Sequence, residues 1–178
     1  MKTLVPKMAL ILLALTASAC IGTTATPKTA SPSPTMSNST AVKTDLAELA
    51  KFIVLPGTPS GAHWQITRLG PDNNDNRSVP GPSTYELTAV IAYSPENLAQ
   101  LKTHSTASDD SSAIDVGEDF FLSWFPPSVK AAFVKQADGR YKFNASRYNA
   151  QAFYKTPYDE GSLLFISPTE VLIVVISD

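Results

Sequence analysis

Side chains on which many active sites and metal sites depend are scarce in this sequence. Its 178 residues include one cysteine, Cys20, and two histidines, His63 and His104. So few of these residues limit both histidine-based acid–base catalysis and zinc binding. The sequence also has no H-E-x-x-H motif, no glycine-rich phosphate loop and no G-x-S-x-G motif. We therefore predict neither a metal site nor a cofactor, and we assign no catalytic residue.

Clusters of basic residues and long apolar runs are also missing. The formal net charge is −2, and no group of lysines and arginines could neutralise the phosphates of a nucleic acid. Nucleic-acid binding is therefore not expected. A transmembrane helix needs about 20 apolar residues, whereas the apolar run over residues 8–15 is much shorter and no later run is long enough. A permanent membrane-spanning helix is not expected either.

The first twenty residues have the composition of an export signal. Two lysines precede the apolar run over residues 8–15, and the small residues 16–19 follow it, directly before Cys20. A basic region, an apolar core and a small-residue cleavage site in this order are typical of a signal peptide. Residues 17–19 read A-S-A, an A-x-A site. Cleavage after them by an ordinary signal peptidase would release a soluble exported protein.

Residues 17–20, A-S-A-C, also resemble the lipobox of bacterial lipoproteins, although leucine is commonest at the first position. The resemblance implies that Cys20 carries lipid on its sulfur, that the signal is cut directly before it, and that the new amine is acylated, palmitate included. An exported domain with one free thiol would otherwise have no internal disulfide partner. We therefore predict a lipoprotein held to a membrane by two or more acyl chains, which anchor stably. A soluble exported protein is the alternative if Cys20 is not lipidated.

The resemblance also implies a location in the cell envelope. In lipoproteins of bacteria with two membranes, an aspartate directly after the cysteine tends to retain the protein in the inner membrane. Here Ile21 and Gly22 follow instead. The expected location is the outer membrane, with the domain facing the periplasm.

Composition divides the chain into three segments. We expect a signal peptide over residues 1–19, a lipidated cysteine with a disordered tether over 20–44, and one globular domain over 45–178. The tether is rich in Ser, Thr and Pro, so it cannot bury enough apolar surface to offset the entropy of ordering. As a flexible coil it would span on the order of 25–30 Å.

Apolar periodicity in the domain predicts an α+β fold. We expect a small, mainly antiparallel sheet, two to four short helices and a C-terminal β-hairpin. The predicted strands cover residues 63–69, 85–93, 162–166 and 171–176, and the predicted helices cover 45–53, a segment beginning at Ser94, and 126–133. The last strand is apolar on both faces, so it should lie centrally in the sheet. Polar loops are expected over 70–83 and 105–112.

One segment allows two interpretations. Asp138-Gly139 fits the turn of a hairpin that joins residues 133–135 to residues 141–143. That hairpin conflicts with the end of the helix predicted over 126–133, and the sequence alone leaves both open.

An aromatic patch and an acidic cluster are the candidates for function. Buried, the patch would be part of the core; exposed, it would be a contact surface for a partner or ligand. The acidic cluster lies in and directly after the second polar loop, and paired carboxylates there could perform the acid–base chemistry of an envelope hydrolase. Charge runs are more often solvated faces. The patch consists of Phe120, Phe121, Trp124 and Phe125, and the cluster, within residues 109–119, of Asp109, Asp110, Asp115, Glu118 and Asp119.

A predicted anchor, a predicted tether and a domain poor in catalytic groups together favour a binding module over an enzyme. Its partner would be another envelope protein or a cell-wall component. The hydrolase that uses carboxylates near residues 109–119 is the rival hypothesis.

Replacing the lipobox cysteine tests the anchor directly. We expect Cys20→Ser to move the protein from the membrane fraction to the soluble or unprocessed pool, because no sulfur remains to carry lipid. Fractionation and intact-mass analysis of the wild type measure this. A mature wild-type protein that begins with an unmodified Cys20 would contradict the prediction.

Overall fold

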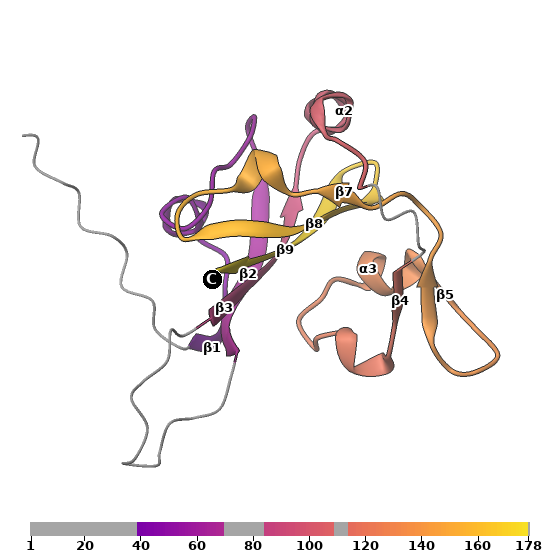
Figure 1. Ribbon diagram of the computed structural model, residues 1–178. Helices are drawn as coiled ribbons and strands as arrows, with labels where there is room; N and C mark the ends of the chain where they lie inside the picture. The colour runs from indigo at the N-terminus through magenta and orange to yellow at the C-terminus, as the bar shows by residue number, and fades with distance from the viewer. Residues whose placement is uncertain (1–38, 70–83, 109–113, 178) are drawn as a thin grey trace, which may run out of the picture. The chain divides into compact units, whose positions relative to one another are not determined.

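Two antiparallel β-sheets form the framework of the domain (Figure 1). The computed structural model describes residues 39–69, 84–108 and 114–177. Within these ranges the large sheet has six strands in the order β1-β2-β3-β9-β8-β7, and the small sheet has three in the order β4-β6-β5. The signal peptide, Cys20 and the loop predicted over 70–83 lie outside the described residues.

The strands are mostly short, and neighbouring strands pair antiparallel in both sheets. The large sheet contains β1 (Ser39–Lys43), β2 (Gly61–Leu69), β3 (Thr84–Ala92), β7 (Tyr148–Asn149), β8 (Tyr158–Ser167) and β9 (Glu170–Ser177). The small sheet contains β4 (Ile114–Val116), β5 (Phe133–Lys135) and β6 (Tyr141–Phe143). Short helices accompany them: α1 (Leu46–Leu49), α2 (Pro95–His104), α3 (Pro127–Ala131) and the 3-10 turns η1 (Glu118–Phe120) and η2 (Gln151–Phe153). The α+β class with a mainly antiparallel sheet is therefore confirmed.

Strand β9 lies centrally, between β3 and β8, as its two apolar faces predict. Side chains alternate across a strand, so one face of β9 contributes to the first core through Val171, Ile173 and Val175. The opposite face contributes Leu172 to the second core. In register, Ile173 lies opposite Ala89 of β3 and Leu163 of β8.

The first core lies between the large sheet and helices α1 and α2. Trp64 of β2 is fully buried there, and its Nε1 donates a hydrogen bond to the Asp45 carbonyl oxygen at 3.2 Å. The ring of Phe52 packs on it with a centroid separation of 5.7 Å. The alternation predicted for residues 63–69 and 85–93 is confirmed, because their alternate apolar side chains enter this core.

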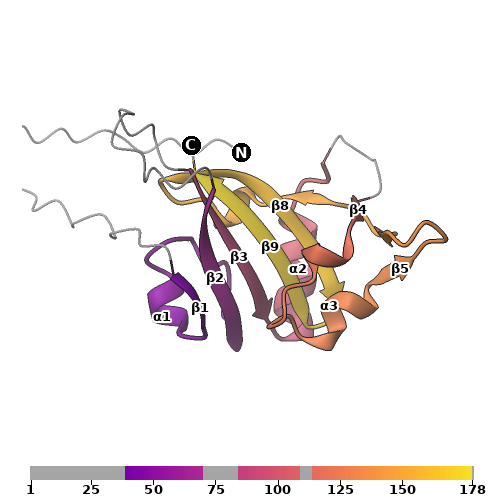
Figure 2. The same ribbon diagram turned by 90° about the horizontal axis from the view of Figure 1, so that it is seen from below.

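The second core lies between the other face of the large sheet and the small sheet with α3. Val90, Leu164 and Leu172 come from the large sheet, and Val129 and Phe133 are among the side chains that meet them. Figures 1 and 2 both show the small sheet and α3 apart from α1, which lies beside β1 and β2.

Capping residues account for where the helices begin. The Glu48 N–H donates to Asp45 Oδ1 at 2.7 Å, and the Asn97 N–H donates to Ser94 Oγ at 3.3 Å. Both helix starts agree with the sequence. Helix α1 ends at Leu49, however, and not at Ile53 as predicted.

The structure corrects the expected boundary between tether and domain. Residues 39–43, predicted to belong to the tether, form β1 on the edge of the large sheet, where Lys43 pairs with Trp64 of β2. Lys43 Nζ lies 5.1 Å from the Trp64 ring and 2.6 Å from Glu48 Oε1. Composition could not reveal this strand, because its hydrogen bonds come from β2, which follows it in the chain.

The two interpretations of residues 126–143 are both realised in adjacent segments. Helix α3 ends at Ala131, and β5 begins at Phe133 and pairs with β6 through a turn that contains Gly139. Gly139 has a φ of 87°, a left-handed conformation that favours glycine.

The described residues contain no helix that is both long enough and apolar enough to cross a membrane.

Gly161 in β8 provides a test of the packing of the central strands. A Cβ at this position would lie 2.3 Å from the backbone oxygen of Val174 in β9, so we expect Gly161→Ala to force the two strands apart. We expect a loss of about 1–3 kcal/mol in unfolding free energy, as for other overpacked sites. Chemical denaturation measures it. Gly61→Ala is the matched control, because no atom lies within 4 Å of its Cβ position; equal effects at both positions would contradict the packing.

Candidate functional site

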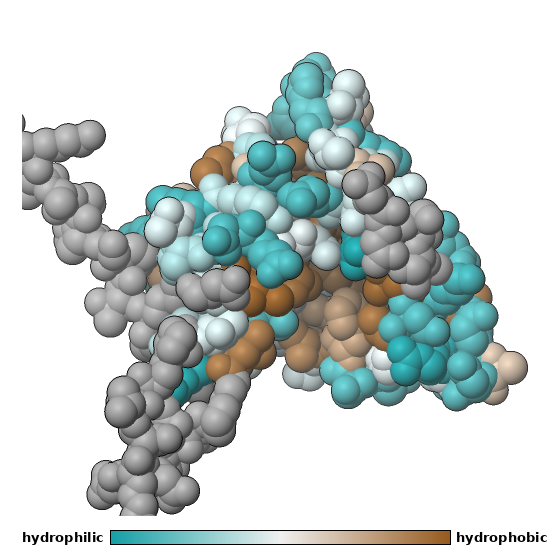
Figure 3. Space-filling view, in the orientation of Figure 1, coloured by the Kyte–Doolittle hydropathy of each residue, from teal (hydrophilic) through white to brown (hydrophobic). Residues whose placement is uncertain are grey.

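The predicted aromatic patch lies over the second core and is half-buried. All four of its side chains pack against that core: Phe120, Phe121, Trp124 and Phe125. The rings contact one another mainly edge to face, with a centroid separation of 4.6 Å for Trp124 and Phe125. Trp124 Nε1 also donates to Gln65 Oε1 at 2.9 Å, which ties this segment to β2. The patch is thus the outer layer of a core, and Figure 3 shows apolar surface where it approaches the large sheet.

Two of the three described carboxylates of the acidic cluster, Asp115 and Glu118, pair with cations, whereas Asp119 is exposed and forms no ion pair among the described residues. Arg140 donates from Nε to Asp115 Oδ1 at 2.7 Å and from Nη2 to the Asp115 carbonyl at 2.8 Å. Glu118 accepts hydrogen bonds from Lys130 Nζ and from the Tyr141 hydroxyl. Asp109 and Asp110 lie outside the described residues.

The electrostatics of Glu118 differ from those of a catalytic acid. The hydrogen bond from Lys130, followed by that from Tyr141, lowers the pKa of the Glu118 carboxyl below its ordinary value. A general acid needs the opposite, a raised pKa that keeps its proton near neutral pH. Among the described residues no three His, Cys, Asp or Glu side chains are grouped so that they could hold a metal ion.

The two histidines lie on separate elements and both are exposed. His63 lies on β2, and its neighbour Trp64 is buried. His104 ends α2 and borders a small polar cavity of about 190 Å³, together with Asn149 and Gln151. The structure thus does not bring the histidines together.

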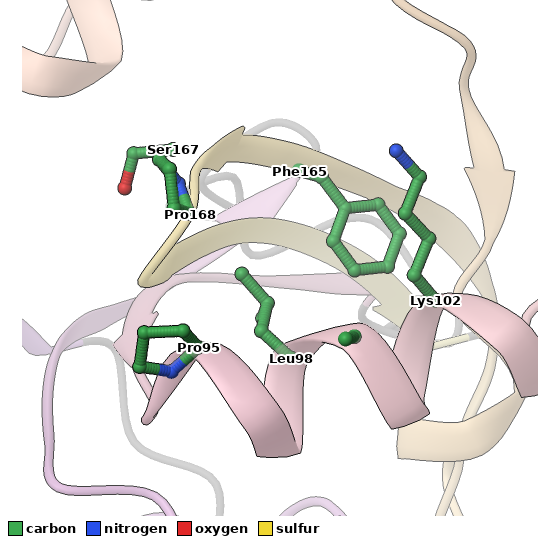
Figure 4. Close-up of a pocket in the computed structure, with 7 residues that line it drawn as sticks. Pro95, Leu98, Lys102, Phe165, Ser167 and Pro168 are labelled. Carbon is green, nitrogen blue, oxygen red and sulfur yellow. The ribbon is translucent and has the colours of Figure 1, made fainter.

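A groove lies between α2 and β8. Its volume is about 390 Å³. Four residues of α2 lie along one side, and residues of β8 and of the turn that follows it lie along the other (Figure 4). The lining consists of Pro95, Leu98, Ala99, Lys102, Phe165, Ser167 and Pro168.

The helix side of the groove follows from the spacing of residues in α2. The four lining residues of α2 lie on one face of the helix: Leu98 and Ala99 are three and four positions after Pro95, and Lys102 is four and three positions after them. Leu98 is buried, because it also packs on the first core. The N-terminus of α2 is held beside the β8–β9 turn, since the Tyr93 N–H donates to the Thr169 carbonyl at 2.8 Å.

The strand side is shaped by Phe165. Its ring stacks edge to face on Tyr148 of β7, with a centroid separation of 5.0 Å, and is half-buried. Lys102 Nζ lies 5.5 Å from the centroid of the same ring. Figure 4 shows Lys102 reaching alongside Phe165 at one end of the groove, with Pro95 and Pro168 at the other. The groove is therefore apolar along its length and positively charged at one end.

The sequence predicts α2 and β8 as elements but not the groove between them. The Ser94-Pro95 start was a signal for a helix, and the apolar run over 163–166, followed by a turn, was a signal for one strand of a hairpin. Their contact joins segments that are more than sixty positions apart, which no local pattern reveals.

Comparison with protein-family models, with curated proteins and with solved structures finds no match to this chain. A function must therefore be inferred from the geometry of the domain and from the residues near Cys20.

The ion pair of Glu118 supplies a test of the acidic cluster. We expect the pKa of the Glu118 carboxyl to lie below its ordinary value, and Lys130→Gln to raise it, because the Lys130 hydrogen bond is the largest cause of the shift. Lys135→Gln is the control and should raise it less, since Lys135 acts only through its charge. NMR titration of the side-chain carboxyl carbons measures both.

The sign of the effect on stability follows from the lowered pKa. The contribution of this pair is present above the unfolded-state pKa of Glu118 and is lost as the pH falls through the folded-state value. A Glu118 pKa above its ordinary value would contradict the pairing and would favour the hydrolase hypothesis.

Proposed function

We propose that this chain is a bacterial envelope lipoprotein, anchored through lipid on Cys20, whose α+β domain is a binding module. The groove between α2 and β8 is its binding site, and the partner is another envelope protein or a cell-wall component. In this proposal the outer membrane holds the anchor and the domain faces the periplasm.

The groove is the observation that carries the proposal. Ligand sites are concave and mostly apolar, have volumes of roughly 300–1,000 Å³, and contain a few polar groups that orient the ligand. The groove of about 390 Å³ fits this description, with Lys102 and Ser167 as its polar side chains. One wall belongs to a C-terminal β-hairpin formed by β8 and β9, which gives the site a rigid support.

The pairing of the carboxylates supports binding over hydrolysis. Asp115 is engaged by Arg140, and Glu118 is engaged by Lys130 and Tyr141. Hydrolysis by two carboxylates requires an acid and a base or nucleophile that face one substrate bond. Neither residue belongs to the lining of the groove.

A lipid anchor at Cys20 is compatible with a binding function of the domain. Eighteen residues, 21–38, lie between Cys20 and β1, so the anchor is separated in sequence from the first strand of the sheet. A tethered binding module can then meet partners fixed to the same envelope at a high effective concentration.

Photo-crosslinking in the native host tests the binding site. We expect p-benzoylphenylalanine at Ala99 to form discrete adducts on irradiation, because Ala99 is exposed within the groove. The same probe at Gln100 is the control, since Gln100 is exposed on the same helix but lies outside the lining. Mass spectrometry of the adducts identifies the partner. Adducts at Ala99 that are no stronger than those at Gln100 would count against the groove as the binding site.

A further inference from the structure

Strand β8 is only partly covered on its outer edge. On that side β7 pairs with it at two positions, Tyr148 with Leu163 and Asn149 with Ser162. Among the described strands none pairs with the β7 side of residues 164–167. Residues 144–147, which connect β6 to β7, form no strand along this edge.

The backbone N–H and carbonyl groups of Phe165 face this open edge. The Ala150 N–H donates to the Gly161 carbonyl at 3.3 Å, so the backbone groups of Gly161 point to the β7 side. In an antiparallel strand these groups alternate between the two sides. Those of Leu163 and Phe165 therefore point the same way as those of Gly161, and at Phe165 no described strand pairs with them. The register of β8 with β9 shifts between Phe165 and Ser167, so this alternation is followed only as far as Phe165. An edge of this kind is a template for one more strand.

The groove runs along the same edge. Figure 1 looks down the axis of α2, which lies beside β7 and β8. From Pro95 to Lys102 the helix rises by about 10 Å, at 1.5 Å per residue. An extended chain covers that distance with about three residues, at 3.3 Å each. A strand on the edge of β8 would thus have α2 as its neighbour for about three residues, and alternate side chains would enter the groove.

The charge in the groove indicates the chemistry of the occupant. Of the residues that line it, Lys102 is the charged one. Its side chain is exposed, and among the described residues no carboxylate forms an ion pair with it. A strand antiparallel to β8 would run from Ser167 toward Phe165, and its C-terminal end would therefore arrive beside Lys102. A carboxylate at that end is complementary to the ammonium group.

We propose that the groove binds an extended peptide segment of a partner protein, with an apolar side chain and a carboxylate, as an antiparallel strand added to the edge of β8. The proposal rests on the binding function of the groove argued above and names the partner class. Backbone hydrogen bonds to Phe165 supply affinity that is independent of sequence. The apolar lining selects the side chain, and Lys102 selects the carboxylate.

A peptide library tests this inference with the full chain in detergent micelles. The probes are seven-residue random peptides immobilised through their N-termini, one set with a free C-terminal carboxylate and a matched set with an amide. Binding to the free-acid set alone assigns the carboxylate to the C-terminus, and binding to both sets through Asp or Glu assigns it to a side chain. A bound set with no carboxylate in common overturns the proposal.

Two further measurements use the peptide that binds best. We expect Lys102→Glu to weaken binding of this peptide by about tenfold or more, because the substitution removes the charge-assisted hydrogen bond from Lys102 to the peptide carboxylate. Lys142→Glu makes the same change in net charge on the exposed face of β6 and should change affinity by less than about twofold, as for other surface charges. Equal losses in the two variants overturn the role of Lys102.

Methylating one peptide nitrogen at a time tests strand addition without altering the protein. We expect binding to be lost at one position, that of the peptide residue paired with Phe165, because its N–H is the one that faces an open carbonyl of β8. Losses at no position, or equal losses at neighbouring positions, overturn strand pairing. If no peptide binds while the Ala99 probe still forms adducts, this inference fails and the proposed function stands. If neither occurs, both fail.

Discussion

Strand β9 is the element on which the rest of the domain depends, because it contributes to two apolar cores at once. Val171, Ile173 and Val175 face the core beneath α1 and α2, and Leu172 faces the core beneath the small sheet. A buried strand of this kind must be apolar on both faces, and it must have a strand on each side to satisfy its backbone. β3 and β8 fill those places. The position of β8, and with it one wall of the groove, is therefore a consequence of the burial of β9.

Local signals in the sequence predicted most of this framework. Capping residues, Thr44 or Asp45 for the first helix and Ser94 for the second, indicated two helix starts, and the alternation around Trp64 identified β2 with its buried face. These features depend on residues a few positions apart, so local sequence patterns are enough to predict them. The central position of β9 was legible too, because a short strand that is apolar throughout is typical of a position covered on both faces.

What could not be predicted depends on contacts between distant parts of the chain. Strand β1 was assigned to the tether because Val42 is the one large apolar residue in it. The strand forms because it pairs with β2 and because Lys43 contacts Trp64. The aromatic patch was recognised, but whether it is core or surface depends on Gln65 and the small sheet. The groove forms only where α2 and β8 lie side by side, so the sequence predicted the two elements but not the groove.

The order of strands in the large sheet also determines when this domain can fold. The strands that lie on either side of β9 do not pair with each other, so β1, β2 and β3 join β8 and β7 only through it. In chain order β9 comes after all of them. A ribosome or an export channel that releases the chain from its N-terminus therefore delivers the central strand last. The sheet cannot close on a partly released chain, and long-range pairings of this kind form slowly. The two parts of the large sheet can therefore join only after β9 has been released.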